Sequence, residues 1–273
     1  SWNVGLGHEF ARRIKAVSPQ TITVFGGPNF PSAEDEQQEF LEKYPAIDCY
    51  FEFEGEIPFV EFFRAMKALD FDWEKFKQAR AKVPNIRYLA DGEIVVGALA
   101  PKINKLDELP SPYLSGVFDK FFDDVLIPMI QTTRGCPFTC TFCWEGGDYF
   151  QKTPRFSQDR IAQELRYVAE RVDTLPDLLI VDANFGMFKE DIETAREIAA
   201  IKTAHAHNWP KSVLAATAKN HKERTVEIVE MLGDTMPPTA AVQSTDPGVL
   251  DHIRRKNVSL DALVTLAQAT AKH

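Results

Sequence analysis

Three of the four cysteines in this 273-residue chain, Cys136, Cys140 and Cys143, lie within eight positions of one another. Their C-x3-C-x2-C spacing, on a loop with glycine and proline, allows three thiolates to bind one metal centre. Thiolates are soft ligands that select zinc or iron–sulfur clusters. Structural zinc needs four protein ligands, and Cys49 lies far upstream. A cubane cluster held by three cysteines, in contrast, keeps one iron open for a substrate or cofactor.

The residues around these cysteines resemble the signature of the radical S-adenosylmethionine (radical SAM) superfamily. The resemblance rests on the cysteine spacing, on the aromatic Phe142 before the third cysteine, and on the β/α units that follow. It implies that Cys136, Cys140 and Cys143 bind three irons of a 4Fe-4S cluster, and that S-adenosylmethionine (SAM) binds the fourth iron. An electron from the cluster would then cleave SAM into methionine and a 5′-deoxyadenosyl radical, so that the cofactor carries the difficult chemistry.

Five residues are candidate contacts for SAM on the basis of this resemblance. The adenine is expected near Phe142. Asp182 and Asn184 end the second strand expected in this region, where superfamily members carry a short polar motif near the amino group of SAM. Gln243 and Ser244 end the fourth expected strand. Each pair has an alternative role: Asp and Asn are common in turns and helix caps, and the residues after Ser244 can begin a helix.

The second half of the chain alternates between the periods of strands and helices. Strands are predicted at 126–133, 178–182, 212–217 and 239–244, and helices at 158–172, 190–201, 222–232, 248–256 and 260–272. Four β/α units are half of a full barrel. We therefore expect a truncated β/α barrel at 125–273, with its active site at the carboxyl ends of the strands.

The first part of the chain predicts a second α/β region. Its first helix is indicated by apolar residues at helical spacing, Leu6, Phe10, Ile14 and Val17. Strands are predicted at 21–27 and 48–53, with helices between and after them, which favours a buried parallel sheet. Because two strands are too few for such a sheet, we expect further strands upstream and interpret the chain as a piece of a longer protein.

This first part resembles the later portion of the Rossmann-like cobalamin-binding domain that precedes the barrel in one large radical SAM subclass. The resemblance rests on the segments 24–28 and 53–56 and on the connector-like segment 106–112. It makes Gly26, Gly27 and Glu54 candidate cobalamin contacts. A tight turn and favourable charge at a helix start are the alternative explanations.

The expected organisation is a partial cobalamin-binding domain at 1–72, a linker at 73–124 and the partial barrel. The linker contains a hairpin-turn signal at Asp91-Gly92. The lower-ligand motif Asp-x-His-x-x-Gly does not occur in the sequence. We therefore expect cobalamin to bind in the intact protein rather than to this chain by itself.

Composition limits the partners that the chain can have. Its 31 Lys and Arg against 40 Asp and Glu give a net charge of −9, which argues against a general nucleic-acid-binding surface. The 44% hydrophobic and 26% charged residues are ordinary for a globular protein. No apolar run approaches the roughly 18 residues of a membrane span, and no leader segment is visible. We expect a cytoplasmic protein that binds neither nucleic acid nor membranes.

These features together predict an α/β radical SAM enzyme that acts on a small-molecule or peptide substrate. A reducing partner such as a flavodoxin or ferredoxin would supply the electron. Cobalamin-dependent methyl transfer is the commonest chemistry that the resemblance implies, and cyclisation or rearrangement also occurs in the family. Two alternatives remain: a radical SAM enzyme with a vestigial cobalamin domain, and a non-catalytic module stabilised by zinc.

Overall fold

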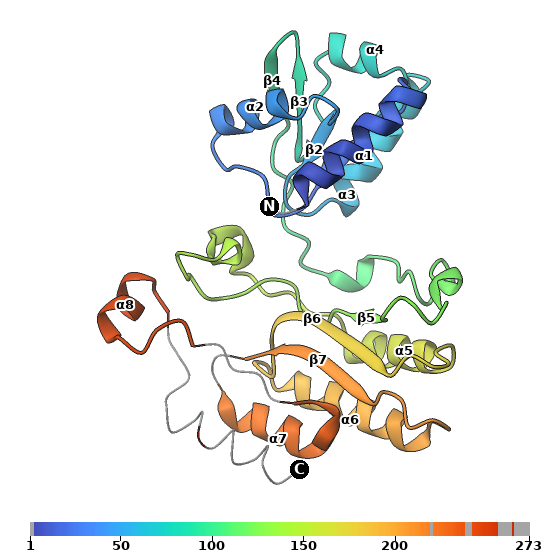
Figure 1. Cartoon of the computed structure of the whole chain (residues 1–273), viewed down its shortest axis with the longest axis vertical. Helices are drawn as coiled ribbons and strands as arrows, with labels where there is room; N and C mark the ends of the chain where they lie inside the picture. The colour runs from blue at the N-terminus through green and yellow to red at the C-terminus, as the bar shows by residue number, and fades with distance from the viewer. Residues whose placement is uncertain (1–2, 219–220, 238–241, 256–263, 265–273) are drawn as a thin grey trace. The chain divides into compact units, whose positions relative to one another are not determined.

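The chain divides into two compact units, Ser1–Ile103 and Asn104–His273 (Figure 1). The computed structural model describes residues 3–218, 221–237, 242–255 and 264. Each unit has its own sheet and its own hydrophobic core. Within the described residues, every helix is too short or too polar to cross a membrane.

Unit 1 contains a mixed sheet in the order β1-β2-β3-β4. The strands are β1 (Val24–Gly26), β2 (Cys49–Phe51), β3 (Ile86–Ala90) and β4 (Glu93–Val96). β1 and β2 are parallel, whereas β2, β3 and β4 pair in antiparallel fashion. The expectation of a parallel sheet was therefore wrong, because a hairpin supplies the strands beyond β2. Its turn residues Asp91 and Gly92 both have positive φ, as a two-residue hairpin requires, which confirms the turn signal.

The segment predicted as the start of a linker is thus built into unit 1. Unit 1 also contains the helices α1 (Val4–Val17), α2 (Glu34–Lys43), α3 (Glu56–Ala68) and α4 (Trp73–Gln78). α4 begins at an N-cap, where the Asp72 side chain accepts a hydrogen bond from Lys75 N. Phe62, Phe76 and Tyr88 are buried together in the core.

The first helix forms as predicted, but its apolar stripe does not face a core. Leu6, Phe10, Ile14 and Val17 are all exposed, with 58% of Phe10 accessible, whereas Ala11 is buried. The helix is joined to its unit by polar contacts, among them the Lys15–Asp48 ion pair. Helical spacing of apolar residues therefore predicted the helix correctly, although the apolar stripe itself is exposed.

Unit 2 contains the parallel sheet β5-β6-β7. Its strands are β5 (Met129–Ile130), β6 (Asp177–Phe185) and β7 (Ser212–Thr217). Its helices are α5 (Gln158–Ala169), α6 (Glu190–Ala204), α7 (Lys222–Leu232) and α8 (Pro247–His252). Short 3-10 turns lie at Leu106–Glu108, Asp119–Phe121, Trp144–Gly146, Asp148–Phe150 and Gly233–Thr235.

The predicted β/α alternation of unit 2 is confirmed, with the bounds of β7 and α7 as expected. β5 is shorter than predicted, since its regular pairing with β6 covers two residues. Residues 242–244 are not in a strand. The rest of the strand predicted at 239–244 and most of the helix predicted at 260–272 lie outside the described residues.

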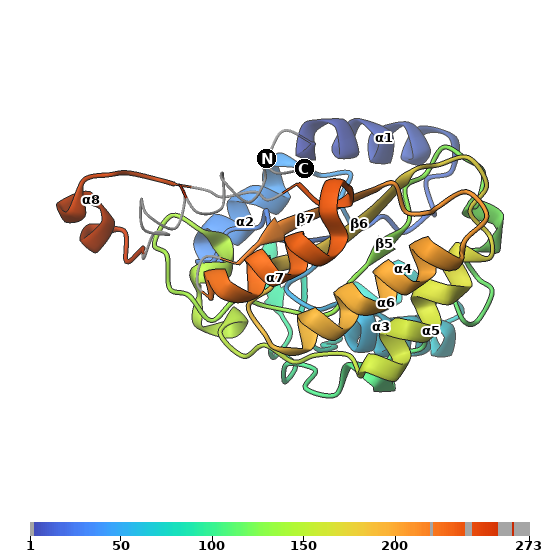
Figure 2. The ribbon, with the colours of Figure 1, turned by 90° about the horizontal axis from the view of Figure 1, so that it is seen from below.

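The helices α5, α6 and α7 lie together on one face of this sheet (Figures 1 and 2). Strand residues alternate accordingly. Those that face the helices are buried, namely Ile130, Leu178, Ile180 and Val213. Their neighbours Met129, Val181 and Leu214 are exposed on the other face. The sheet is therefore a β/α layer with one covered face, as expected for part of a barrel.

Candidate metal centre

The cysteine loop follows β5, at the carboxyl end of the parallel sheet. Cys136 and Cys140 are 3% and 4% exposed, whereas Cys143 is exposed. Backbone hydrogen bonds shape the loop: Cys136 N donates to Phe150 O at 2.9 Å, and Cys143 N donates to Cys140 O at 3.1 Å. The returning chain thus holds the first cysteine, and a tight turn joins the other two.

Gly146 closes this turn by packing directly against Cys140. A Cβ atom placed on Gly146 would lie 2.2 Å from Cys140 O, where no side chain fits without a backbone shift. Thr141 N donates to Ile253 O at 3.1 Å, so the chain after α8 also holds the loop. Gly146 was not among the predicted site residues, although two adjacent glycines after Trp144 are a signal of close packing.

Asn184 is the predicted polar residue that the structure brings to the cysteines. Its Nδ2 atom lies 3.2 Å from Cys136 Sγ, in hydrogen-bonding geometry. The side chain is 4% exposed, and its buried Oδ1 atom has no hydrogen-bond partner among the residues that the structure describes. Leaving a buried acceptor unsatisfied is costly, so this oxygen suits a ligand that donates a hydrogen bond beside Cys136.

Asp182 is turned toward the start of the cysteine loop. It accepts hydrogen bonds from Thr132 N at 2.7 Å, from Thr133 N at 3.1 Å and from the Thr132 hydroxyl. Burial raises the pKa of Asp182, and the hydrogen bonds from Thr132 and Thr133 oppose that rise. The pairing of β6 with β7 shifts register between Ile180 and Phe185, and such irregularities re-aim side chains at strand ends.

The other predicted SAM contacts lie at more open positions. Phe142 is more than half exposed, and Gln243 is also exposed. Ser244 Oγ accepts a hydrogen bond from Asp246 N at 3.1 Å. Asp246 in turn caps α8 by accepting from Val249 N at 2.9 Å, so the alternative role of this segment as a helix start is present in the structure.

Arg155 and Asp191 lie beside the loop and were not singled out from the sequence. Arg155 donates to Asp191 Oδ1 at 2.7 Å and to the Thr133 hydroxyl. Asp191 also accepts from Gly186 N and Phe188 N, in the turn after β6. No local motif indicates these contacts, because Arg155 and Asp191 are far apart in the chain.

The three cysteines of the loop supply the soft donors that an iron–sulfur cluster needs. Within the described part of the chain, no three His, Cys, Asp or Glu side chains form a group that could hold one metal ion. The soft donor set and the open acceptor of Asn184 fit such a cluster with a bound cofactor.

Comparison with known families agrees with this geometry. A model of the radical SAM superfamily matches residues 130–272, which is more than half of the chain. The chain belongs to the radical SAM superfamily. The matched segment begins in β5 and includes the three cysteines and Asn184.

Two curated relatives match nearly all of the chain. It is 31% identical to the cobalamin-dependent radical SAM methyltransferase TokK of Streptomyces tokunonensis, over 99% of this chain and 39% of the relative. It is 32% identical to 2-(S-pantetheinyl)-carbapenam-3-carboxylate methyltransferase of Streptantibioticus cattleyicolor, with the same two coverages. The chain therefore spans about two fifths of the length of these radical SAM relatives.

Solved structures show the same fold at lower identity. The cobalamin-dependent SAM radical enzyme OxsB, with aqua-cobalamin and SAM bound, matches with a TM-score of 0.63 and 16% identity, over 98% of this chain and 38% of that one. The radical SAM methyltransferase TsrM of Kitasatospora setae matches with a TM-score of 0.70 and 14% identity, over 99% and 51%. Both matches extend over unit 1 as well as the radical SAM unit.

The cobalamin candidates of unit 1 differ in how well they fit a ligand. Gly27 has a φ of 104°, and the space that its Cβ would occupy is open, so a ligand can approach the backbone at this strand end. Gly26 lies at the end of β1, with the Phe51 carbonyl oxygen 3.5 Å from a Cβ position. Glu54, in contrast, accepts a hydrogen bond from Ile103 N at 2.8 Å. That hydrogen bond involves one of its two carboxylate oxygens, Oε2.

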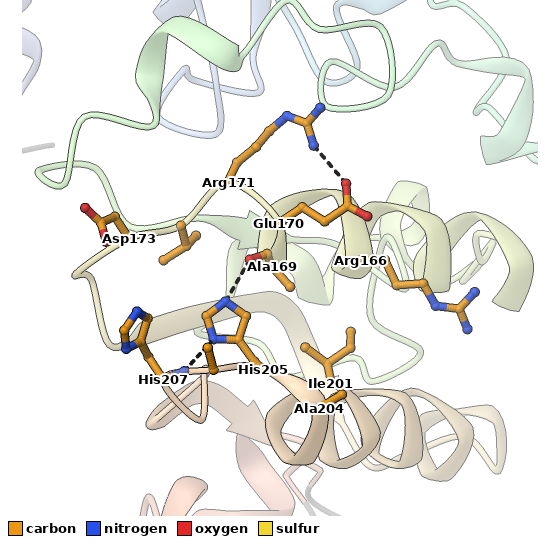
Figure 3. A pocket seen from close by; sticks show the side chains of 11 residues that line it. Arg166, Ala169, Glu170, Arg171, Asp173, Ile201, Ala204, His205 and His207 are labelled. Carbon is orange, nitrogen blue, oxygen red and sulfur yellow. Dashed lines mark hydrogen bonds and ion pairs between the residues drawn. The ribbon is translucent and has the colours of Figure 1, made fainter.

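A cavity of about 630 Å³ lies at the opposite edge of the radical SAM unit, between the carboxyl ends of α5 and α6 (Figure 3). His205 Nε2 lies 2.9 Å from Ala169 O, and His205 Nδ1 accepts from His207 N at 3.3 Å. Arg166 forms an ion pair with Glu197 at 2.6 Å. None of the predicted site residues is among those that line the cavity, so it is not part of the candidate site.

Proposed function

We propose that the protein is a radical SAM enzyme whose cysteine loop holds a 4Fe-4S cluster and SAM. In its intact form it would transfer a methyl group to a small-molecule substrate with the help of cobalamin. The observation that carries the proposal is the buried Asn184 amide against Cys136, with Oδ1 left open. Support comes from the superfamily match and from two relatives named as methyltransferases.

Each residue of the loop has a distinct role in this proposal. Cys136, Cys140 and Cys143 hold three irons and leave the fourth iron for the amino and carboxylate groups of SAM. When bound, the cluster supplies one electron to the sulfonium of SAM. Asn184 keeps Cys136 in place through Nδ2 and accepts an N–H of the SAM amino group at Oδ1. The exposed Phe142 ring offers its face to the adenine.

Asp182, Gln243 and Ser244 take different positions in the proposal. Because Asp182 accepts hydrogen bonds from Thr132 N and Thr133 N, it would position the cysteine loop rather than contact SAM. Gln243 and Ser244 are on a segment open to solvent or half-buried and would contact the polar groups of SAM from the other side.

Unit 1 would contribute the turn at Gly26 and Gly27 to cobalamin binding, whereas Glu54 would stabilise the fold. The intact protein would work in the cytoplasm and receive its electron from a flavodoxin or ferredoxin.

Cobalamin binding is measured by the change in the cobalamin absorption spectrum on titration with protein. A spectrum that stays that of free cobalamin with the intact protein would remove this part of the proposal.

The test of SAM binding is the electron paramagnetic resonance (EPR) spectrum of the reduced, anaerobically reconstituted chain. Adding SAM should shift the spectrum, because its amino and carboxylate groups bind the open iron. Asn184→Ala should weaken the apparent affinity for SAM by about tenfold, the worth of one buried hydrogen bond. Asn104→Ala, at an exposed position, is the matched control and should leave it unchanged. A full cluster with no shift at millimolar SAM would contradict the proposal.

A further inference from the structure

We propose that Arg155 and Asp191 form a positioning pair that fixes Asn184 relative to Cys136, and thereby the geometry in which SAM meets the cluster. This inference rests on the proposed function. Neither residue touches the cysteines, so both are positioning residues and not catalytic ones.

The first observation is that Arg155 ties the start of the cysteine loop to the turn after β6. One guanidinium nitrogen donates to the Thr133 hydroxyl, three residues before Cys136. Another donates to Asp191 Oδ1 at 2.7 Å. Arg155 also pairs with Thr133 through an isolated antiparallel bridge. The central guanidinium carbon of Arg155 lies 4.8 Å from the centroid of the Phe188 ring. This contact limits the orientations that the guanidinium can take.

The second observation is that Asp191 holds the backbone of the turn that follows Asn184. Its Oδ2 atom accepts from Gly186 N at 2.8 Å and from Phe188 N at 3.0 Å. Gly186 follows Asn184 by two residues and has a φ of 91°. A Cβ on Gly186 would lie 3.1 Å from Thr225 Oγ1 on α7. The turn is therefore tightly specified, with Asp191 only 1% exposed at its centre.

These contacts form a closed path that includes both Cys136 and Asn184. From Cys136 the path runs back to Thr133, across Arg155 to Asp191, and through Gly186 to Asn184, which returns to Cys136 at 3.2 Å. Each link is a hydrogen bond or a short stretch of chain. A shift in the Arg155–Asp191 link consequently moves the Asn184 amide relative to the thiol that it contacts.

The variants are chosen to avoid an unpaired buried charge. Breaking a buried ion pair by removing one partner is far more damaging than replacing both charges with neutral groups. The double variant Arg155→Gln/Asp191→Asn removes both charges at once. Arg166→Gln/Glu197→Gln is the matched control, because it removes both charges of an ion pair that joins α5 to α6. In this pair Arg166 is exposed and Glu197 is half-buried. Arg155→Lys keeps the positive charge but replaces the planar guanidinium, which donates to both Thr133 and Asp191, with a single ammonium group.

The readout is a SAM titration of the reduced-cluster EPR spectrum, together with iron content and thermal unfolding. We expect the double variant to keep its iron and to need at least tenfold more SAM for the same shift. Arg155→Lys should lie between the double variant and wild type, and the control should match wild type. The double variant is expected to unfold at a lower temperature, but stability alone does not change SAM affinity in folded protein.

Two results would overturn the inference while leaving the proposed function intact. One is a SAM affinity within twofold of wild type in iron-loaded Arg155→Gln/Asp191→Asn. The other is loss of iron in both the double variant and Arg155→Lys, which would assign the pair to cluster retention and not to SAM geometry. A wild-type chain with a full cluster and no SAM-dependent shift would instead overturn the proposed function, and the inference with it.

Discussion

Both units bury polar side chains near the ends of their strands, but they use them differently. In unit 1, Arg87 lies 2.7 Å from Glu52 and donates to Gln37 at 3.1 Å. Burial raises the pKa of Glu52, and the charge of Arg87 opposes that rise. In unit 2, Asn184 contacts the Cys136 thiol and leaves an acceptor free.

Burial of polar groups therefore does not by itself mark a binding site. In unit 1, the buried charges of Arg87 and Glu52 pair with each other inside a mixed sheet. In unit 2, an acceptor stays open next to a thiol that can bind metal. The same contrast separates Cys49, buried in the core of unit 1, from the three cysteines of the loop.

The sharpest test of this contrast is the iron content of cysteine variants. Cys140→Ala should abolish the cluster after anaerobic reconstitution, because two thiolates do not hold a cubane on this loop. Cys49→Ala should keep the iron and sulfide content of wild type, since Cys49 belongs to the other unit. Loss of iron in Cys49→Ala alone would show that the ligands are wrongly assigned.

Glycine variants compare the two units at their strand-end turns. Gly146→Ala should lower the iron content severalfold, because its Cβ would lie 2.2 Å from Cys140 O and move the loop. Gly27→Ala meets open space, so it should cost only the backbone strain of a positive φ, about 1–3 kcal/mol. Iron analysis and urea unfolding measure the two effects. Equal iron loss in both variants would remove the distinction between the turns.

Cysteine alkylation of the metal-free chain should separate the four thiols by rate. Cys143 is exposed and should react first, with Cys136 and Cys140 slower. Cys49 should react last, because it is buried and burial raises the pKa of its thiol, which lowers the thiolate fraction. Mass spectrometry of timed samples at pH 8 gives the order. Early labelling of Cys49 in folded protein would contradict its burial.

The raised pKa of Cys49 also has a consequence for stability, smaller than the effects above. A thiol with a higher pKa in the folded than in the unfolded state favours folding fully below the unfolded pKa, which is about 8.5. That contribution is lost as the pH rises above this value. Cys49→Ala should therefore flatten the fall of the unfolding temperature between about pH 8.5 and 10. An unchanged slope would assign the fall to other groups.

The sequence predicted those features that depend on local spacing. The cysteine loop, α7 and β7 follow from patterns within a few residues of one another. Asn184 was a candidate because it ends a strand at which the resembled superfamily carries a short polar motif. The open acceptor of Asn184 was not predictable, because it depends on how β6 departs from the register of β7.

The remaining features depend on contacts between distant residues. Arg155 and Asp191 are separated by a helix and a strand, so no periodicity relates them. The apolar residues along one side of α1, among them Phe10, have the spacing of a buried helix face, but their side chains are exposed. The β3–β4 hairpin was indicated by its turn, but its pairing with β2 brings together residues such as Phe51 and Ile86, which only the tertiary fold determines.

The central claim is that SAM binds the open iron beside Asn184 and Cys136. Electron–nuclear double resonance of the reduced cluster, with SAM labelled with 15N at its amino group, tests it most directly. We expect a 15N hyperfine coupling to the cluster in the wild-type chain, and a changed coupling in Asn184→Ala at saturating SAM. A sample with full iron content that shows no 15N coupling at millimolar SAM would contradict the claim.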